Sequence, residues 1–141
     1  MNVTGQGVQK HIERPSHPIP RKYVEPILYL AERMGNQDKL VPAPGKRIVD
    51  ELAEALQMKD FRRQPWFRSL SEQRACEMLD LETVKLAALV VLTLVMKVDT
   101  TRGDAAKAYF SKTRQALGME PISLPAELEV HKDLAFRYLV G

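Results

Sequence analysis

The stretch Leu86-Ala87-Ala88-Leu89-Val90-Val91-Leu92-Thr93-Leu94-Val95-Met96 decides the fold. Its side chains are all apolar except that of Thr93, and no charged residue interrupts it. A helix that is hydrophobic on every side has to be surrounded by other elements, so we expect this run to form the buried centre of one domain. It is too short to span a membrane, because a spanning helix needs roughly 20 apolar residues.

A buried β-strand is the rival interpretation of this run. Val90, Val91, Thr93 and Val95 are β-branched, which favours a strand. We favour a helix because no glycine or proline brackets the run, and because Leu81-Glu82-Thr83-Val84-Lys85 leads into it without a turn signal.

The segments on both sides of this run carry helical patterns. Ile48, Val49, Leu52, Ala53 and Leu56 have the spacing of an amphipathic helix. An earlier helix should begin near Tyr23, with Pro26 in its first turn, and should be closed by Gly35 and Asn36. We expect a short helical turn at 61–67 and a helix at 72–79 that Ser71 caps. Two further helices are expected, one at 104–117 that Gly118 ends and one at 128–139. The sequence therefore predicts an all-α, single-domain bundle of about seven helices around a buried central helix.

The net charge of +3 belongs to the N-terminal arm. Up to Lys22 the chain has the basic residues Lys10, Arg14, Arg21 and Lys22 and the acidic residue Glu13, so the remainder is neutral. We expect residues 1–21 to form a flexible or extended arm and residues 22–141 to form the helical domain. A nucleic-acid-binding domain would carry a basic patch on its folded body, so we do not expect nucleic acid as a partner.

Composition excludes several further classes. The single cysteine, Cys76, cannot form an intramolecular disulfide, and the N-terminus has no apolar signal segment. We expect a cytoplasmic protein with no membrane insertion. We interpret Cys76 as a small core residue and His131 as a hydrogen-bonded, partly buried side chain. We expect Trp66 and Phe67 to cover the core, and we favour this role over that of a ligand platform. We expect Arg62, Arg63 and Arg68 to form a solvated rim, and we favour this role over that of an anion-binding site.

A faint internal repeat relates the two halves of the chain. A shift of 61 residues places Asp38 on Asp99, and it places Ala55-Leu56-Gln57-Met58 on Ala116-Leu117-Gly118-Met119. Each half then consists of a helix, a loop with an aspartate, a second helix and an Ala-Leu-x-Met ending. The pattern predicts two similar helical hairpins about a pseudo-two-fold axis, with the apolar helix between them.

Three stretches of the chain resemble the TerB-like (tellurite-resistance protein B) helical domains, namely Ala31–Val41, Val95–Thr100 and the ending Ala116–Met119. In that family an apolar helix ends in Ala-x-x-Asp-Gly, and a second helix ends in Leu-Gly-hydrophobic. The resemblance spans roughly residues 23–119 and implies a helical domain linked to a tellurite or metal-stress response. This chain departs from the family pattern at Lys39 and Thr100, which replace the glycine after each aspartate.

The resemblance implies that loop carboxylates bind a metal ion, with Asp38, Asp99 and Asp104 as candidate ligands. Carboxylates suit this role because hard cations prefer several oxygen ligands. Gly45 and Ala106 stand where the family pattern has a further acid. The alternative for Asp38 and Asp99 is a loop residue that bonds its own backbone.

No catalytic motif is visible in the sequence, so we expect no enzyme and no cofactor. Two functions stay open. The first is a protein-interaction module that binds a protein partner. The chain could also form a homo-oligomer. The alternative is a divalent-cation-binding or cation-sensing domain.

Overall fold

The computed structural model describes residues 19–35, 44–97, 104–120 and 128–140, and within these ranges the chain is helical with no β-strand. Seven α-helices and one short 3₁₀ turn make up the described part: α1 (Arg21–Gly35), α2 (Pro44–Ala55), η1 (Phe61–Arg63), α3 (Pro65–Ser69), α4 (Glu72–Met78), α5 (Glu82–Lys97), α6 (Asp104–Leu117) and α7 (Leu128–Leu139). The predicted all-α bundle around a central helix is confirmed. The pseudo-two-fold repeat stays a prediction.

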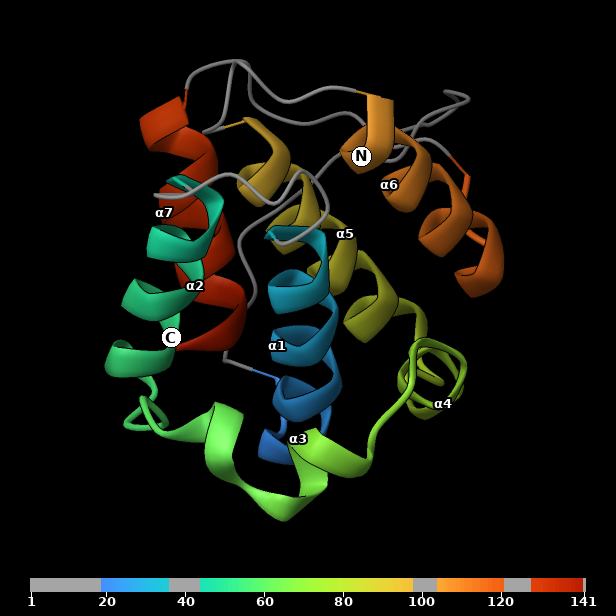
Figure 1. Ribbon diagram of the computed structural model, residues 1–141. Helices are drawn as coiled ribbons and strands as arrows, with labels where there is room; N and C mark the ends of the chain where they lie inside the picture. The colour runs from blue at the N-terminus through green and yellow to red at the C-terminus, as the bar shows by residue number, and fades with distance from the viewer. Residues whose placement is uncertain (1–18, 36–43, 98–103, 121–127, 141) are drawn as a thin grey trace.

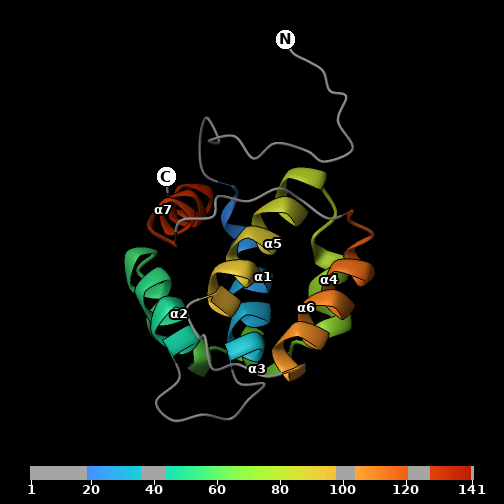
Figure 2. The ribbon, with the colours of Figure 1, turned by 90° about the horizontal axis from the view of Figure 1, so that it is seen from above.

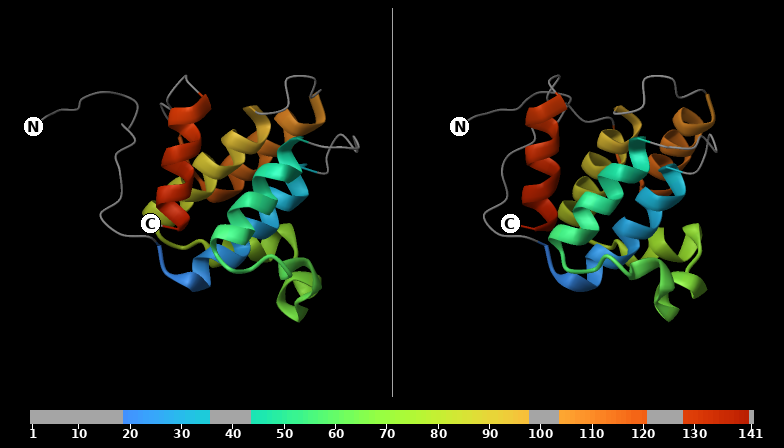
Figure 3. Two further views of the ribbon diagram at one scale, coloured as in Figure 1. Left: turned by 90° about the vertical axis from the view of Figure 1, so that its left-hand side faces the viewer. Right: turned by 60° about the vertical axis from the view of Figure 1, so that its left-hand side comes forward.

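The helices lie in three layers (Figures 1 and 2). Helices α1 and α5 form the middle layer, α2 and α7 cover one side, and α4 and α6 cover the other. Helix α5 contacts α1, α2, α6 and α7, and its residues from Ala87 to Val95 are all buried. The segment between α2 and α5 crosses one end of the molecule and carries η1, α3 and α4 (Figure 3).

The strand alternative is wrong, because the run lies within the helix α5. Thr93 is the one polar side chain in the run, and its hydroxyl donates a 2.8 Å hydrogen bond to the carbonyl of Leu89. Side-chain bonding to the carbonyl four residues back is a helical arrangement. A chain with internally paired backbone and an apolar surface can be buried on all sides without leaving a polar group unpaired.

Helix α1 is buried to the same extent as α5, and it begins earlier than we expected. It starts at Arg21, so Pro26 lies within the helix and not in its first turn. Tertiary contacts explain the early start: Tyr23 and Val24 are buried, and the Ile19 amide donates to the Tyr138 carbonyl at 3.1 Å. The end of the expected arm therefore contacts the body.

Two of the predicted helix-end residues, Ser71 and Gly118, are confirmed. The amide of Arg74 donates to the hydroxyl of Ser71 at 3.1 Å, which caps α4 as predicted. Gly118 follows α6 with φ +68, as expected for a helix C-terminus. Asp80 accepts a 2.9 Å hydrogen bond from the hydroxyl of Tyr23, which ties α1 to the chain before α5.

The Ala-Leu-x-Met segments end α2 and α6 with the same hydrogen bonds. The amide of Met58 donates to the carbonyl of Ala53 at 2.7 Å, and the amide of Met119 donates to that of Arg114 at 3.1 Å. In each case the residue before the methionine has positive φ, +59 at Gln57 and +68 at Gly118. This is the Schellman arrangement, which glycine adopts at lowest cost and a glutamine only with strain.

His131 joins the outer helix α7 to the centre of α5. Its side chain is fully buried, and its Nε2–H donates to the Val90 carbonyl at 2.9 Å. Nδ1 is buried and has no partner among the described residues, so the ring can hold only one proton without burying an unpaired N–H. Burial, together with the nearby charge of Lys97, lowers the pKa of His131 below its usual value. The predicted hydrogen-bonded histidine is confirmed, and it is more deeply buried than expected.

Replacement of Leu92 by alanine should reduce the free energy of unfolding by about 2–5 kcal/mol, because the side chain is 0% exposed in the middle of the core. Leu81→Ala is the matched control, since Leu81 is 49% exposed and should change stability by no more than about 0.5 kcal/mol. Chemical denaturation measures both values. A cost below about 1 kcal/mol for Leu92→Ala would contradict its place in the core.

Stability should fall as the pH is lowered from 7 toward 5.5. His131 has a lowered pKa in the folded state, so the unfolded chain binds the proton first, below the ordinary histidine pKa of about 6.5, and acid favours unfolding. One proton limits the slope to about 1.4 kcal/mol per pH unit. Denaturation of His131→Gln over the same range should show a flatter pH profile, and identical profiles would contradict this role.

Candidate functional site

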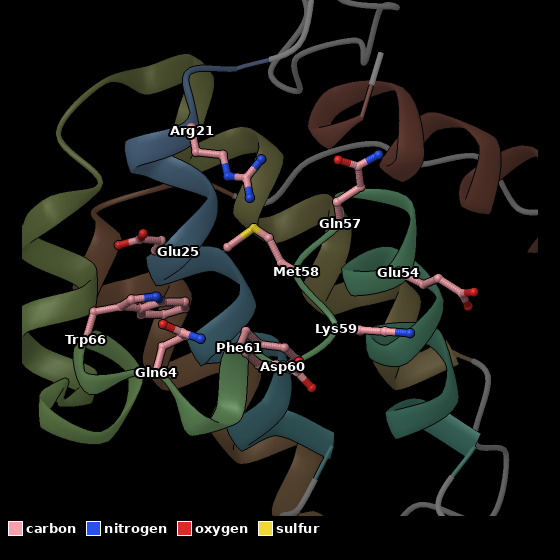
Figure 4. A pocket seen from close by; sticks show the side chains of 10 residues that line it. All are labelled: Arg21, Glu25, Glu54, Gln57, Met58, Lys59, Asp60, Phe61, Gln64 and Trp66. Carbon is pink, nitrogen blue, oxygen red and sulfur yellow. The ribbon is translucent and has the colours of Figure 1, made fainter.

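An open hollow on the described surface lies between the first turns of α1 and the segment that follows α2 (Figure 4). It has a volume of about 590 Å³ and is open to solvent. Met58, Phe61 and Trp66 form its apolar wall, and Gln57 and Gln64 add polar groups. Its charged residues are Arg21, Glu25, Glu54, Lys59 and Asp60. We call this hollow the Trp66 pocket.

The strained turn at Gln57 shapes the pocket. Because Gln57 has a φ of +59, the chain reverses direction directly after α2. This reversal brings Met58 into the space between α1 and α2, as Figure 4 shows. Residues held in a left-handed conformation cost about 1–3 kcal/mol and occur frequently at binding sites, so this turn supports the choice of the Trp66 pocket as the candidate site.

A cluster of aromatic rings supports Trp66 from behind. The ring of Trp66 lies 5.9 Å from that of Phe67, which is 5.3 Å from each of the rings of Tyr29 and Phe61. Such offset and edge-to-face pairs stabilise the packing beyond the area that they bury. Trp66 and Phe67 are both partly buried and pack against the core, as predicted. Trp66 in addition lines the pocket.

A buried acidic residue fixes the segment that forms the pocket wall. Glu32 on α1 is only 5% exposed, and its carboxylate accepts a 2.8 Å hydrogen bond from Arg62, which also donates to Asp50 at 2.7 Å. Lys46 lies 3.6 Å from the second oxygen of Glu32. The interpretation of Arg62 as part of a solvated rim was therefore wrong, because it overlooked Glu32 as a partner. Arg63 and Arg68 are exposed, as expected.

On the opposite side of α1, a second polar cluster offers no reactive group. Arg33 donates to Glu72 at 2.7 Å, and the hydroxyl of Tyr109 is buried without a partner among the described residues. Burial raises the pKa values of Tyr109 and of the partly buried Cys76 thiol. A thiol with a raised pKa stays protonated and is a poor nucleophile, so Cys76 is a packing residue.

The candidate metal ligands are only partly covered by the structure. Asp38 and Asp99 lie outside the described residues, and Asp104 is the first residue of α6. Within the described ranges, no three His, Cys, Asp or Glu side chains are grouped so that they could hold a metal ion. The three aspartates stay a prediction of the sequence. Among these same ranges no helix is long and apolar enough to cross a membrane.

Comparison with protein-family models, with curated proteins and with solved structures gave no match. The resemblance to TerB-like domains therefore rests on the residues quoted from the sequence and stays a prediction.

We expect no cation response, against what that resemblance implies. One matching carboxylate in each loop offers too few hard ligands for a tight Ca²⁺ or Mg²⁺ site. A site saturated at about 100 times its dissociation constant would add about 2.7 kcal/mol, which corresponds to a rise in melting temperature of roughly 3–6 °C for this size. A thermal-shift series with millimolar Ca²⁺, Mg²⁺ and Mn²⁺ should show no such rise.

The variants Asp38→Asn and Asp99→Asn serve as controls for this series. Both should behave like the unchanged chain. A reproducible rise with one cation that either substitution abolishes would establish metal binding instead.

Proposed function

We propose that this chain is a non-enzymatic helical interaction module that binds a segment of another protein in the Trp66 pocket. The observation that carries the proposal is the pocket itself, which combines an apolar wall with charged side chains around an open hollow. Binding sites of this kind are concave and largely apolar, with a small number of polar groups that orient the ligand. Membership of the TerB-like family, and a place in a tellurite or metal-stress response, form the part of this proposal that rests on the sequence motif alone.

The geometry of the pocket fits a binding role better than a catalytic one. The described residues that line it include no histidine, serine, threonine or cysteine, and its potential nucleophiles are Lys59 and the carboxylates of Glu25, Glu54 and Asp60. General acid–base chemistry needs a proton donor or acceptor poised near the working pH. The wall residue Met58, by contrast, has a flexible and polarisable side chain, which adapts to different apolar partners.

The test is site-specific photocrosslinking in cells that express the full chain. A benzoylphenylalanine at Lys59, an exposed residue of the pocket, should give a discrete adduct, whereas the same group at the exposed Lys112 on α6 should not. The adduct at Lys59 should disappear when Met58→Glu is added, because the new carboxylate replaces the apolar wall with a charge.

Two controls accompany this experiment. The Met58→Glu variant has to retain its helical far-UV circular dichroism, and the protein identified in the adduct has to bind the purified chain. Equal adducts at Lys59 and Lys112, or adducts insensitive to Met58→Glu, would contradict the proposed function.

A further inference from the structure

The charged side chains around the Trp66 pocket have no ionic partner in the part of the chain that the structure describes. Arg21, Glu25, Glu54, Lys59 and Asp60 form no ion pair with any other described residue. Three acidic residues elsewhere on the described surface do have partners: Asp50, Glu51 and Glu72 each lie 2.7 Å from a basic side chain.

These unpaired charges limit what can fill the pocket. A purely apolar ligand would remove water from them without supplying a partner, and the burial of an unpaired charge is costly. Because three of the five are acidic and two are basic, a complementary ligand carries charges of both signs with an excess of positive charge.

Trp66 provides a surface for such a positive charge. Trp66 is the single tryptophan of the chain, and Figure 4 shows it on the same side of the pocket as Glu25, across from Lys59 and Glu54. Tryptophan is the best aromatic partner of a lysine ammonium or arginine guanidinium. A basic side chain on this ring can contact the Trp66 ring and the Glu25 carboxylate together.

A second hollow, of about 290 Å³, lies next to the Trp66 pocket. Arg21 and Gln57 line both hollows, and the walls of the second are the apolar side chains of Ile19, Val24 and Leu139 with those of neighbouring residues. Two adjoining hollows that both combine apolar and polar lining suit a linear chain with basic and apolar residues in succession. A compact molecule would occupy only one of the two.

We propose that the two hollows together bind an extended, basic peptide segment of a partner protein, with a lysine or arginine on Trp66 beside Glu25, and an apolar side chain in the second hollow. This inference rests on the proposed function and adds the chemistry of the partner. Recognition of an extended segment through side-chain pockets is an established mode of peptide binding.

Selection from a display library of random peptides of about nine residues, against the full chain, tests this inference. The enriched peptides should contain lysine or arginine together with leucine-like residues. Titration of one enriched peptide should change the fluorescence of Trp66, which as the single tryptophan reports directly on the pocket. Raising the salt concentration from about 50 to 500 mM should weaken binding at least about fivefold.

The matched variants are Glu25→Gln with Asp60→Asn, and Glu120→Gln as the control. Glu120 is exposed and lies outside both hollows, so its variant should bind as the unchanged chain does. The double variant should bind at least about tenfold more weakly, which corresponds to 1.4 kcal/mol. Asp60 makes no side-chain cap at η1, so the fold should be unaffected.

Three results would overturn the inference. Enrichment of acidic or uncharged peptides that still require Met58 would refute the basic segment and leave the interaction function standing. Self-association that Met58→Glu abolishes would assign the pocket to a second copy of the chain. If no enriched peptide depended on Met58, the basic segment would be refuted, and the photocrosslinking result alone would decide the proposed function.

Discussion

Burial of α5 on every side is the constraint on which the rest of the structure depends. The helix pairs its own backbone groups, and Thr93 bonds to the carbonyl of Leu89, so the loss of water leaves no polar group of the run unsatisfied. Removal of this apolar surface from water is favourable by roughly 25 cal/mol per Å². That gain requires neighbours on all sides, and α1, α2, α6 and α7 supply them. The three-layer arrangement follows from this requirement.

Two polar anchors limit how the neighbours can be placed. The hydrogen bond from His131 to the carbonyl of Val90 fixes α7 against α5, and the contact of Glu32 with Arg62 fixes η1 against α1. His131 and Glu32 are both buried, so a displaced helix would leave a buried polar or charged group without a partner. Such a group costs more than a typical apolar contact contributes. The anchors therefore fix one arrangement of helices whose apolar surfaces alone would allow the helices to shift along one another.

The Trp66 pocket is a consequence of these anchors. Arg62 binds Glu32 on α1 and Asp50 on α2, so η1 stays close to both helices, and the chain between α2 and α3 has to cross the gap between them. The left-handed turn at Gln57 begins that crossing, and the aromatic cluster around Phe67 ends it at Trp66. Between the two, the side chains do not fill the space, and the hollow remains open to solvent.

The sequence by itself determined the helical class, the central helix and several helix ends, because these depend on local periodicity and on residues such as Ser71 and Gly118 that act on their own backbone. It also indicated that His131 is a hydrogen-bonded, partly buried side chain. The partner of Glu32 is 30 residues away and that of His131 is 41 residues away, and no local pattern encodes such pairs. The pocket joins residues from Arg21 to Trp66. Only the tertiary structure decided it, because its walls come from separate elements whose relative positions are set by the buried core.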